Sequence, residues 1–118
     1  MATLRQGLIV LANVPGAQHN PRPVVVVRPP SGSDPKDAAF VTGISSSVAN
    51  PPPAQHVLLP YHPKGHPRTG LTKRCVAKCE WSFAIEQQQI VGVKGYVPIA
   101  YMKTILEQLA LLGQLPNP

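Results

Sequence analysis

The chain has 118 residues, 43% of them hydrophobic, with 15 prolines and a formal net charge of +6. This length suits one domain, residues 1–118, and the hydrophobic share is enough for a packed core, which argues against wholesale disorder. The longest apolar run is too short to cross a bilayer, so no membrane association is expected. The excess of basic residues suits a polyanionic partner, either nucleic acid or an acidic protein, or else a basic domain without such a partner.

Five segments are predicted to be β-strands because each is short, rich in β-branched or aromatic residues, and bounded by Gly, Pro, Asn or Ser. They are residues 7–14, 23–28, 38–45, 56–61 and 73–81. For the first segment, a strand is favoured over a signal peptide, since a single arginine precedes only a short apolar stretch. The four valines of the second strand predict a strand that is buried on both faces.

The C-terminal part changes from strand patterns to helical spacing. Apolar residues that recur with a period of 3.6 predict one helix, and they are Ile99, Met102, Ile105, Leu106, Leu109 and Leu112. Pro98 suits the first helical turn and Gly113 suits a C-terminal stop. The leucines are expected to contact the core or a second copy of the chain. The expected fold class is therefore mainly β, a small strand-rich barrel with one C-terminal α-helix.

Arg22 stands between two prolines, immediately before the four valines. Pro21 and Pro23 each push the residue before them toward an extended backbone, so Arg22 is held stiffly at the start of the strand. Its planar guanidinium carries five donors and suits phosphate oxygens. The alternative is a strand-edge arginine that only solubilises the end of a buried strand.

The two cysteines do not predict a disulfide. On a strand, the Cα atoms of Cys75 and Cys79 would lie about 13 Å apart at ~3.3 Å per residue, too far to bridge, which suits a reducing cytoplasm. Their position on a strand also disfavours a shared zinc ion. His62 and His66 lie in a proline-containing loop that cannot present both imidazoles as a helix would. The sequence predicts no metal and no other cofactor.

The segments follow one another in a specific order: GLIVLANVPG, RPVVVV, VTGISSS, HVLLP, GLTKRCVAKCEW and IVGVKGYVPIAYMKTILEQL. Arg-Pro precedes an apolar strand, a hydroxyl residue ends the third strand, and an acidic residue comes late in the fifth. In this order, over residues 7–109, the chain resembles the PemK/MazF family of toxin endoribonucleases. The resemblance implies an SH3-like barrel, a homodimer, and metal-independent cleavage of single-stranded RNA. It also implies neutralisation by an antitoxin protein whose acidic segment occupies the RNA groove.

The resemblance implies a set of catalytic residues. Arg22 matches the family's catalytic arginine and Ser45 its hydroxyl partner, with Ser46 adjacent, while Lys78 and Glu80 match an acid and a base. In metal-free cleavage, the 2′-OH of RNA attacks the neighbouring phosphate and leaves a cyclic phosphate and a 5′-OH. This reaction needs a base, a cation and an acid, the roles expected of Glu80, Arg22 and Lys78. Residues two apart on a strand share a face, which also suits a solvated surface ion pair.

Two departures from the family pattern bear on activity. The loop before Arg22 is shorter than usual, and Trp81 begins a segment that replaces a common Arg-Thr-Ile-like ending, removing one cationic contact. His19, three residues before Arg22, is a further catalytic candidate, because histidine is the side chain most used for acid–base chemistry near neutral pH. The alternative for His19 is an exposed loop histidine.

The segment between the fourth and fifth strands is rich in basic residues. It predicts either a solvated loop or a flap over bound RNA. The proposed RNA-binding residues in this loop and at the strand ends beside it are Tyr61, Lys64, Arg68, Lys73 and Arg74. The leading prediction is a toxin that acts as a sequence-selective endoribonuclease in the cytoplasm. The alternatives are a catalytically weakened barrel that binds RNA or an acidic peptide without cleavage, and a toxin with another target.

Overall fold

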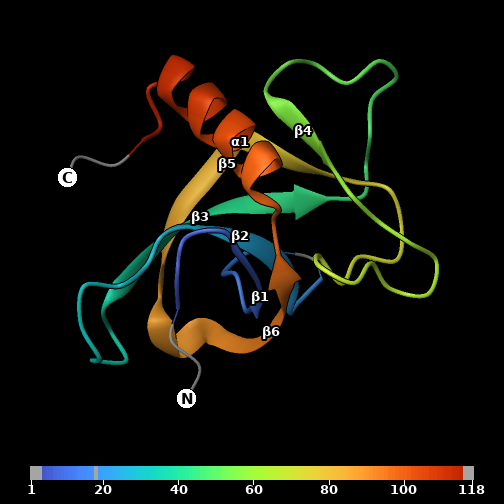
Figure 1. Cartoon of the computed structure of the whole chain (residues 1–118). Helices are drawn as coiled ribbons and strands as arrows, with labels where there is room; N and C mark the ends of the chain where they lie inside the picture. Colours follow the sequence, from blue (N-terminus) through green and yellow to red (C-terminus); the bar gives the residue numbers. More distant parts are fainter. Residues whose placement is uncertain (1–3, 18, 116–118) are drawn as a thin grey trace.

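The structure, a computed structural model, describes residues 4–17 and 19–115. In this part the chain forms six strands, a short 3-10 turn (η1) and one α-helix (Figure 1). The elements are β1 (Leu8–Ala12), β2 (Arg22–Arg28), β3 (Ala38–Ser45), β4 (His56–Leu59), β5 (Cys75–Glu86), η1 (Gln87–Gln89), β6 (Ile90–Tyr96) and α1 (Ile99–Leu111). The predicted mainly β fold class with a C-terminal helix is confirmed.

The six strands form one antiparallel sheet in the order β4-β5-β3-β2-β1-β6. Figure 1 shows that this sheet curves strongly around the interior, so that its two edge strands, β4 and β6, lie at the ends of an open, barrel-like wall. The loop after β4 also reaches β6, because the Tyr96 N–H donates to the Arg68 carbonyl oxygen at 2.8 Å. This loop therefore bridges from one edge strand of the sheet to the other.

The prediction of five strands was wrong in two respects. β6 was not predicted as a strand, and β5 continues to Glu86 instead of ending at Trp81. β6 reads IVGVKGY and contains two glycines, which have low strand propensity. It becomes a strand because it pairs with β1. The second half of β5 is likewise a strand because it pairs with the first half of β3.

The two faces of the sheet carry two separate apolar clusters. Successive side chains of a strand point to opposite faces, so Val25 and Val27 join one cluster and Val24 and Val26 the other. All four are at most 3% exposed, which confirms that the valine run is buried on both faces. The helix α1 covers the first cluster with Met102, Ile105 and Leu109.

The apolar stripe of the helix is buried only in its middle. Ile99, which was expected in the stripe, is 89% exposed because it is the first helical residue and lies before the part of the helix that packs on the sheet. Leu112 follows the helix and is 41% exposed. Gly113 ends the helix as predicted, with φ of 70°. No helix in the described residues is long and apolar enough to cross a membrane.

Candidate functional site

Arg22 is the first residue of β2, and three local features fix it there. Asn20 bridges the preceding loop, since its side chain accepts from the Val14 N–H at 2.9 Å and donates to the Val14 carbonyl at 3.0 Å. Arg22 pairs with Ala12 of β1, and its Nη2 donates to the Ile44 carbonyl oxygen at 3.3 Å. The guanidinium is therefore anchored at one end, with further donors available to a ligand.

A pocket of about 530 Å³ opens where β2 begins, β3 ends and β5 begins. It brings together five residues predicted for the site: His19, Arg22, Ser45, Ser46 and Lys73. The other lining residues are Pro21, Pro23, Ile44, Ser47 and Cys75. Three donors of different kinds, a guanidinium, an ammonium and hydroxyls, thus face one concave surface. Such a set can bind an anion of the size of a phosphodiester segment.

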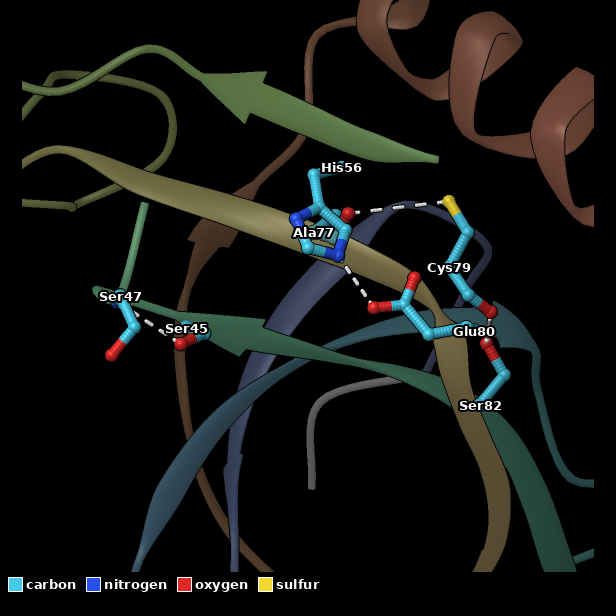
Figure 2. A network of polar contacts seen from close by, with 7 residues as sticks. All are labelled: Ser45, Ser47, His56, Ala77, Cys79, Glu80 and Ser82. Atoms are coloured by element: carbon cyan, nitrogen blue, oxygen red, sulfur yellow. Dashed lines mark hydrogen bonds and ion pairs between the residues drawn. The ribbon is translucent and has the colours of Figure 1, made fainter. Parts of the chain in front are cut away.

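Ser45 is the last residue of β3, and its hydroxyl is oriented by the next turn. The Ser47 N–H donates to Ser45 Oγ at 3.1 Å (Figure 2). Because Oγ accepts this bond, its own proton remains available for a ligand in the pocket. The hydroxyl is therefore arranged as a donor beside Arg22, which suits its predicted role toward a phosphate oxygen.

Lys78 and Glu80 do not line the pocket. Lys78 pairs with Gly43 of β3, and Ser45 pairs with Val76, so Lys78 and Ser45 lie on the same face of the sheet. Glu80 instead contacts His56 of β4: its Oε1 lies 2.5 Å from His56 Nε2 (Figure 2). Glu80, the predicted base, is thus paired with a histidine. Lys78, the predicted acid, lies closer to Ser45 along the sheet than Glu80 does.

The basic loop between β4 and β5 is more ordered than a free flap. Thr69 is fully buried, its hydroxyl donates to the Pro60 carbonyl at 2.8 Å, and His66 Nδ1 accepts from the Arg68 N–H at 3.1 Å. Of the RNA-binding residues predicted in this region, only Lys73 lines the pocket. The side chains that lie outside it are those of Tyr61, Lys64, Arg68 and Arg74.

Three residues that contact predicted site residues, or support such a contact, were given no role in the site from the sequence. The Arg22 guanidinium lies over the ring of Trp81, 4.7 Å from its centroid. Gly43 lies against the same indole, and His56 holds Glu80. Because these contacts join different strands, they depend on the register of the sheet. The sequence marked Trp81 only as the start of the segment that departs from the family's common ending and as the single tryptophan of the chain.

Both cysteines are free and buried, in agreement with the prediction that they form no disulfide. Burial and, to a lesser extent, the nearby Glu80 carboxylate together raise the pKa of the Cys79 thiol to about 11. Burial also raises the pKa of the Cys75 thiol, against the opposing effect of Lys73. Both thiols are therefore uncharged at neutral pH. Among residues 4–17 and 19–115, no three His, Cys, Asp or Glu side chains are grouped to hold a metal ion.

We expect Cys79 to make stability depend on pH above 9. Its pKa is about 11 in the folded chain, against an ordinary value of 9.0, so the unfolded chain loses this proton first as the pH rises. The stabilisation is complete below pH 9 and is lost between pH 9 and 11, by about 2–3 kcal/mol. Urea unfolding of the wild type and Cys79→Ala across this range measures it. A constant difference between the two proteins would contradict the assignment.

Comparison with known proteins places this geometry in a family. The family model described as PemK-like, MazF-like toxin of type II toxin-antitoxin system matches residues 5–113. No curated protein matches the sequence significantly. Because the family match covers nearly the whole chain, it shows family membership independently of the fold.

Solved structures agree with this match at the level of the fold. The Mycobacterium tuberculosis toxin MazF-mt6 is similar with a TM-score of 0.66 and 17% identity, over 93% of this chain and 99% of that one. A MazE-MazF structure from Deinococcus radiodurans gives 0.69 and 19%, over 98% and 100%. An endoribonuclease in complex with its cognate antitoxin, from a mycobacterial species, gives 0.67 and 16%, over 98% and 100%. On the family match and this shared fold, the chain belongs to the PemK-like, MazF-like toxin family of type II toxin–antitoxin systems.

Proposed function

We propose that residues 1–118 act as a single toxin domain that cleaves single-stranded RNA without a metal ion. The observation that carries the proposal is the pocket in which Arg22, Ser45, Ser46, Lys73 and His19 meet. Family membership supports it, as do structural neighbours described as endoribonucleases. The net charge of +6 further favours a polyanionic substrate.

In the proposed reaction, the pocket binds the scissile phosphate. The 2′ oxygen of the RNA attacks phosphorus, the bond to the 5′ oxygen breaks, and the products are a 2′,3′-cyclic phosphate and a 5′-OH. Arg22 stabilises the negative charge that develops on the phosphorane, and Ser45 donates to one of its oxygens. Lys73 and Ser46 hold the neighbouring backbone of the RNA. Positioning plus charge stabilisation accounts for most of the expected acceleration.

Two proton transfers complete the proposed reaction. Glu80 takes the proton of the 2′-OH and Lys78 protonates the leaving 5′ oxygen, as the family resemblance implies. Glu80 must then exchange its contact with His56 for one with the RNA. His19 lines the pocket directly and supplies an imidazole to either transfer. A pH–rate profile of His19→Ala that matches the wild type would remove His19 from the mechanism.

A second function is favoured by one specific observation. Because Glu80 is bonded to His56 and lies outside the pocket, the chain has an anion-binding pocket whose proposed base is occupied. Such a protein would bind RNA or an acidic peptide without cutting RNA. Binding needs Arg22 and Lys73, whereas cleavage also needs a base and an acid.

One experiment separates the two functions. Purified protein is incubated with a labelled single-stranded RNA in EDTA, and both anisotropy and the product ends are measured. The proposed enzyme gives fragments with cyclic-phosphate and 5′-OH ends. Saturable binding with intact RNA after long incubation would contradict the enzyme and support the binding protein. Double-stranded RNA of the same sequence is the matched control and is expected to remain uncut.

The proposed partners follow from the family. We propose that a small antitoxin with an acidic segment neutralises the toxin by occupying the basic pocket, in the cytoplasm, and that two copies of the chain form a homodimer. Structural neighbours include complexes with a cognate antitoxin, and the positive net charge suits an acidic segment. Light scattering is expected to give twice the mass of one chain. Co-expression of the antitoxin from the adjacent gene is expected to relieve the growth arrest that the toxin causes.

A further inference from the structure

The indole of Trp81 connects strand β5 to Arg22, the proposed catalytic arginine. Trp81 is partly buried, and the Arg22 guanidinium lies over its ring, with Cζ 4.7 Å from the ring centroid. At this distance an arginine is attracted by the negative face of the indole. The contact joins β5 to the start of β2, two strands that are separated in the sheet by β3.

A bulge in β5 brings Trp81 to this position. Thr42 of β3 pairs with Ser82, but the next residue, Gly43, pairs with Lys78, so three residues of β5 have no partner of their own on β3. Ser82 fixes the bulge, because its hydroxyl donates to the Cys79 carbonyl at 2.8 Å and lies 2.8 Å from the Thr42 hydroxyl. Bulges of this kind change the direction of a side chain, and here the redirected side chain is Trp81.

Gly43 makes room for the indole. A Cβ atom at this position would overlap the six-membered part of the Trp81 ring, with Cε3, Cζ3 and Cδ2 as its nearest atoms. The glycine does not have positive φ, so it is not needed for its backbone conformation. Its role is to let the ring lie flat on β3, within reach of Arg22.

Arg22 has few other contacts that could orient it. Its Nη2 donates to the Ile44 carbonyl at a long 3.3 Å, and its buried Nε has no hydrogen-bond partner in the part of the chain that the structure describes. Within these residues, the ring of Trp81 is the flat surface against which the guanidinium plane can settle. The remaining donors of Arg22 then face the pocket that it lines.

We propose that Trp81 is the positioning residue of Arg22: the indole, lying on Gly43, holds the guanidinium in the orientation that binds the scissile phosphate. This inference rests on the proposed ribonuclease function. It also assigns a role to the position at which the chain departs from the family's common cationic ending. Where the family commonly has a second cation, this chain has an aromatic ring that orients the guanidinium of Arg22.

Substitution of Trp81 tests the proposal through the split between kcat and KM. Trp81→Leu is expected to lower kcat for RNA cleavage about 10-fold, with KM changed less than about 3-fold, because the cation remains but its orientation is lost. Trp81→Phe keeps an aromatic face and is expected to recover most of this loss. Phe83→Leu is the matched control, since Phe83 lies on the same strand, 5.6 Å from Trp81, and is expected to cleave like the wild type. A folded Trp81→Leu with wild-type kcat would overturn the proposal.

Fluorescence tests the same contact without any cleavage. Trp81 is the only tryptophan, so the emission of the protein reports on its surroundings. Arg22→Ala is expected to shift the emission to longer wavelength and to increase quenching by acrylamide, whereas Arg28→Ala leaves both unchanged. Binding of a 2′-O-methyl RNA that cannot be cut is expected to change the emission of the wild type. No change in Arg22→Ala would overturn the positioning role, even if RNA is cleaved.

Gly43→Ala tests the contact where Trp81→Leu does not fold, and a double substitution tests it where both variants fold. Gly43→Ala is expected to displace the indole and to lower kcat about as much as Trp81→Leu does. In the presence of Trp81→Leu, the added methyl group meets a smaller side chain, so its further effect on kcat is expected to be less than 2-fold. Independent, multiplicative losses would overturn the proposal. If the wild type cleaves no RNA, the proposed function fails. The fluorescence of Arg22→Ala then still shows whether Arg22 and Trp81 are in contact.

Discussion

Arg22→Ala is expected to lower kcat for RNA cleavage by about 10³-fold. Among the residues that the structure describes, Arg22 is the only arginine that lines the pocket, so the substitution removes its guanidinium. Loss of one preorganised donor to a developing oxyanion costs this much in enzymes that stabilise similar charge. The fold is expected to survive, since Arg22 lies at the start of β2 and the hydrogen bond from its side chain to the Ile44 carbonyl is long. Single-turnover cleavage of a labelled RNA in EDTA measures the effect.

Arg28→Ala is the matched control for this substitution. Arg28 is the last residue of the same strand, is exposed, and does not line the pocket. It is expected to cleave within about 3-fold of the wild type, with the difference due to general attraction between charges. If both variants lose activity equally, net charge and not the position of Arg22 governs the reaction. If neither loses activity, Arg22 is not catalytic.

Gly95→Ala is expected to destabilise the fold by about 3 kcal/mol. A Cβ atom on Gly95 would collide with backbone atoms of Arg68 and Thr69, at the place where the loop after β4 is hydrogen-bonded to β6. Backbone atoms cannot rotate away as side chains do, so β6 or the loop must move. Urea unfolding monitored by circular dichroism gives the change in free energy.

Gly92→Ala provides the control in the same strand. Nothing lies within 4 Å of the position where its Cβ would stand, so its effect is expected to be smaller than about 1 kcal/mol. Equal losses of stability in both variants would mean that β6 simply tolerates no side chain. A stable Gly95→Ala would mean that the contact between the loop and β6 is looser than the structure shows.

Much of the fold could be predicted from local sequence patterns. The valine run predicted a strand buried on both faces, and the apolar spacing after Pro98 predicted the helix; the structure confirms both. β6 could not be predicted in this way, because its glycines oppose a strand and only pairing with β1 makes it one. Ile99 was misplaced because spacing does not reveal where a helix first meets the sheet.

The candidate site divides in the same way. Arg22 and Ser45 meet because β2 and β3 are antiparallel neighbours, so the start of β2 lies beside the end of β3. The order of the segments in the sequence implies this arrangement. The contacts of Trp81 with Gly43 and of Glu80 with His56 depend on the bulge in β5 and on its pairing with β4. A bulge leaves no reliable mark in one sequence, so these contacts required the structure.

The most direct test of the account uses an RNA with one 2′-deoxy nucleotide at the position where the wild-type protein cuts. In the proposed reaction, the pocket of Arg22 and Ser45 directs the RNA's own 2′-OH at the phosphate, without a metal. In EDTA, the modified RNA is expected to bind with the affinity of the unmodified RNA and to remain intact at that position. Cleavage of the modified RNA at the same bond would rule out this reaction, because the nucleophile would then come from elsewhere.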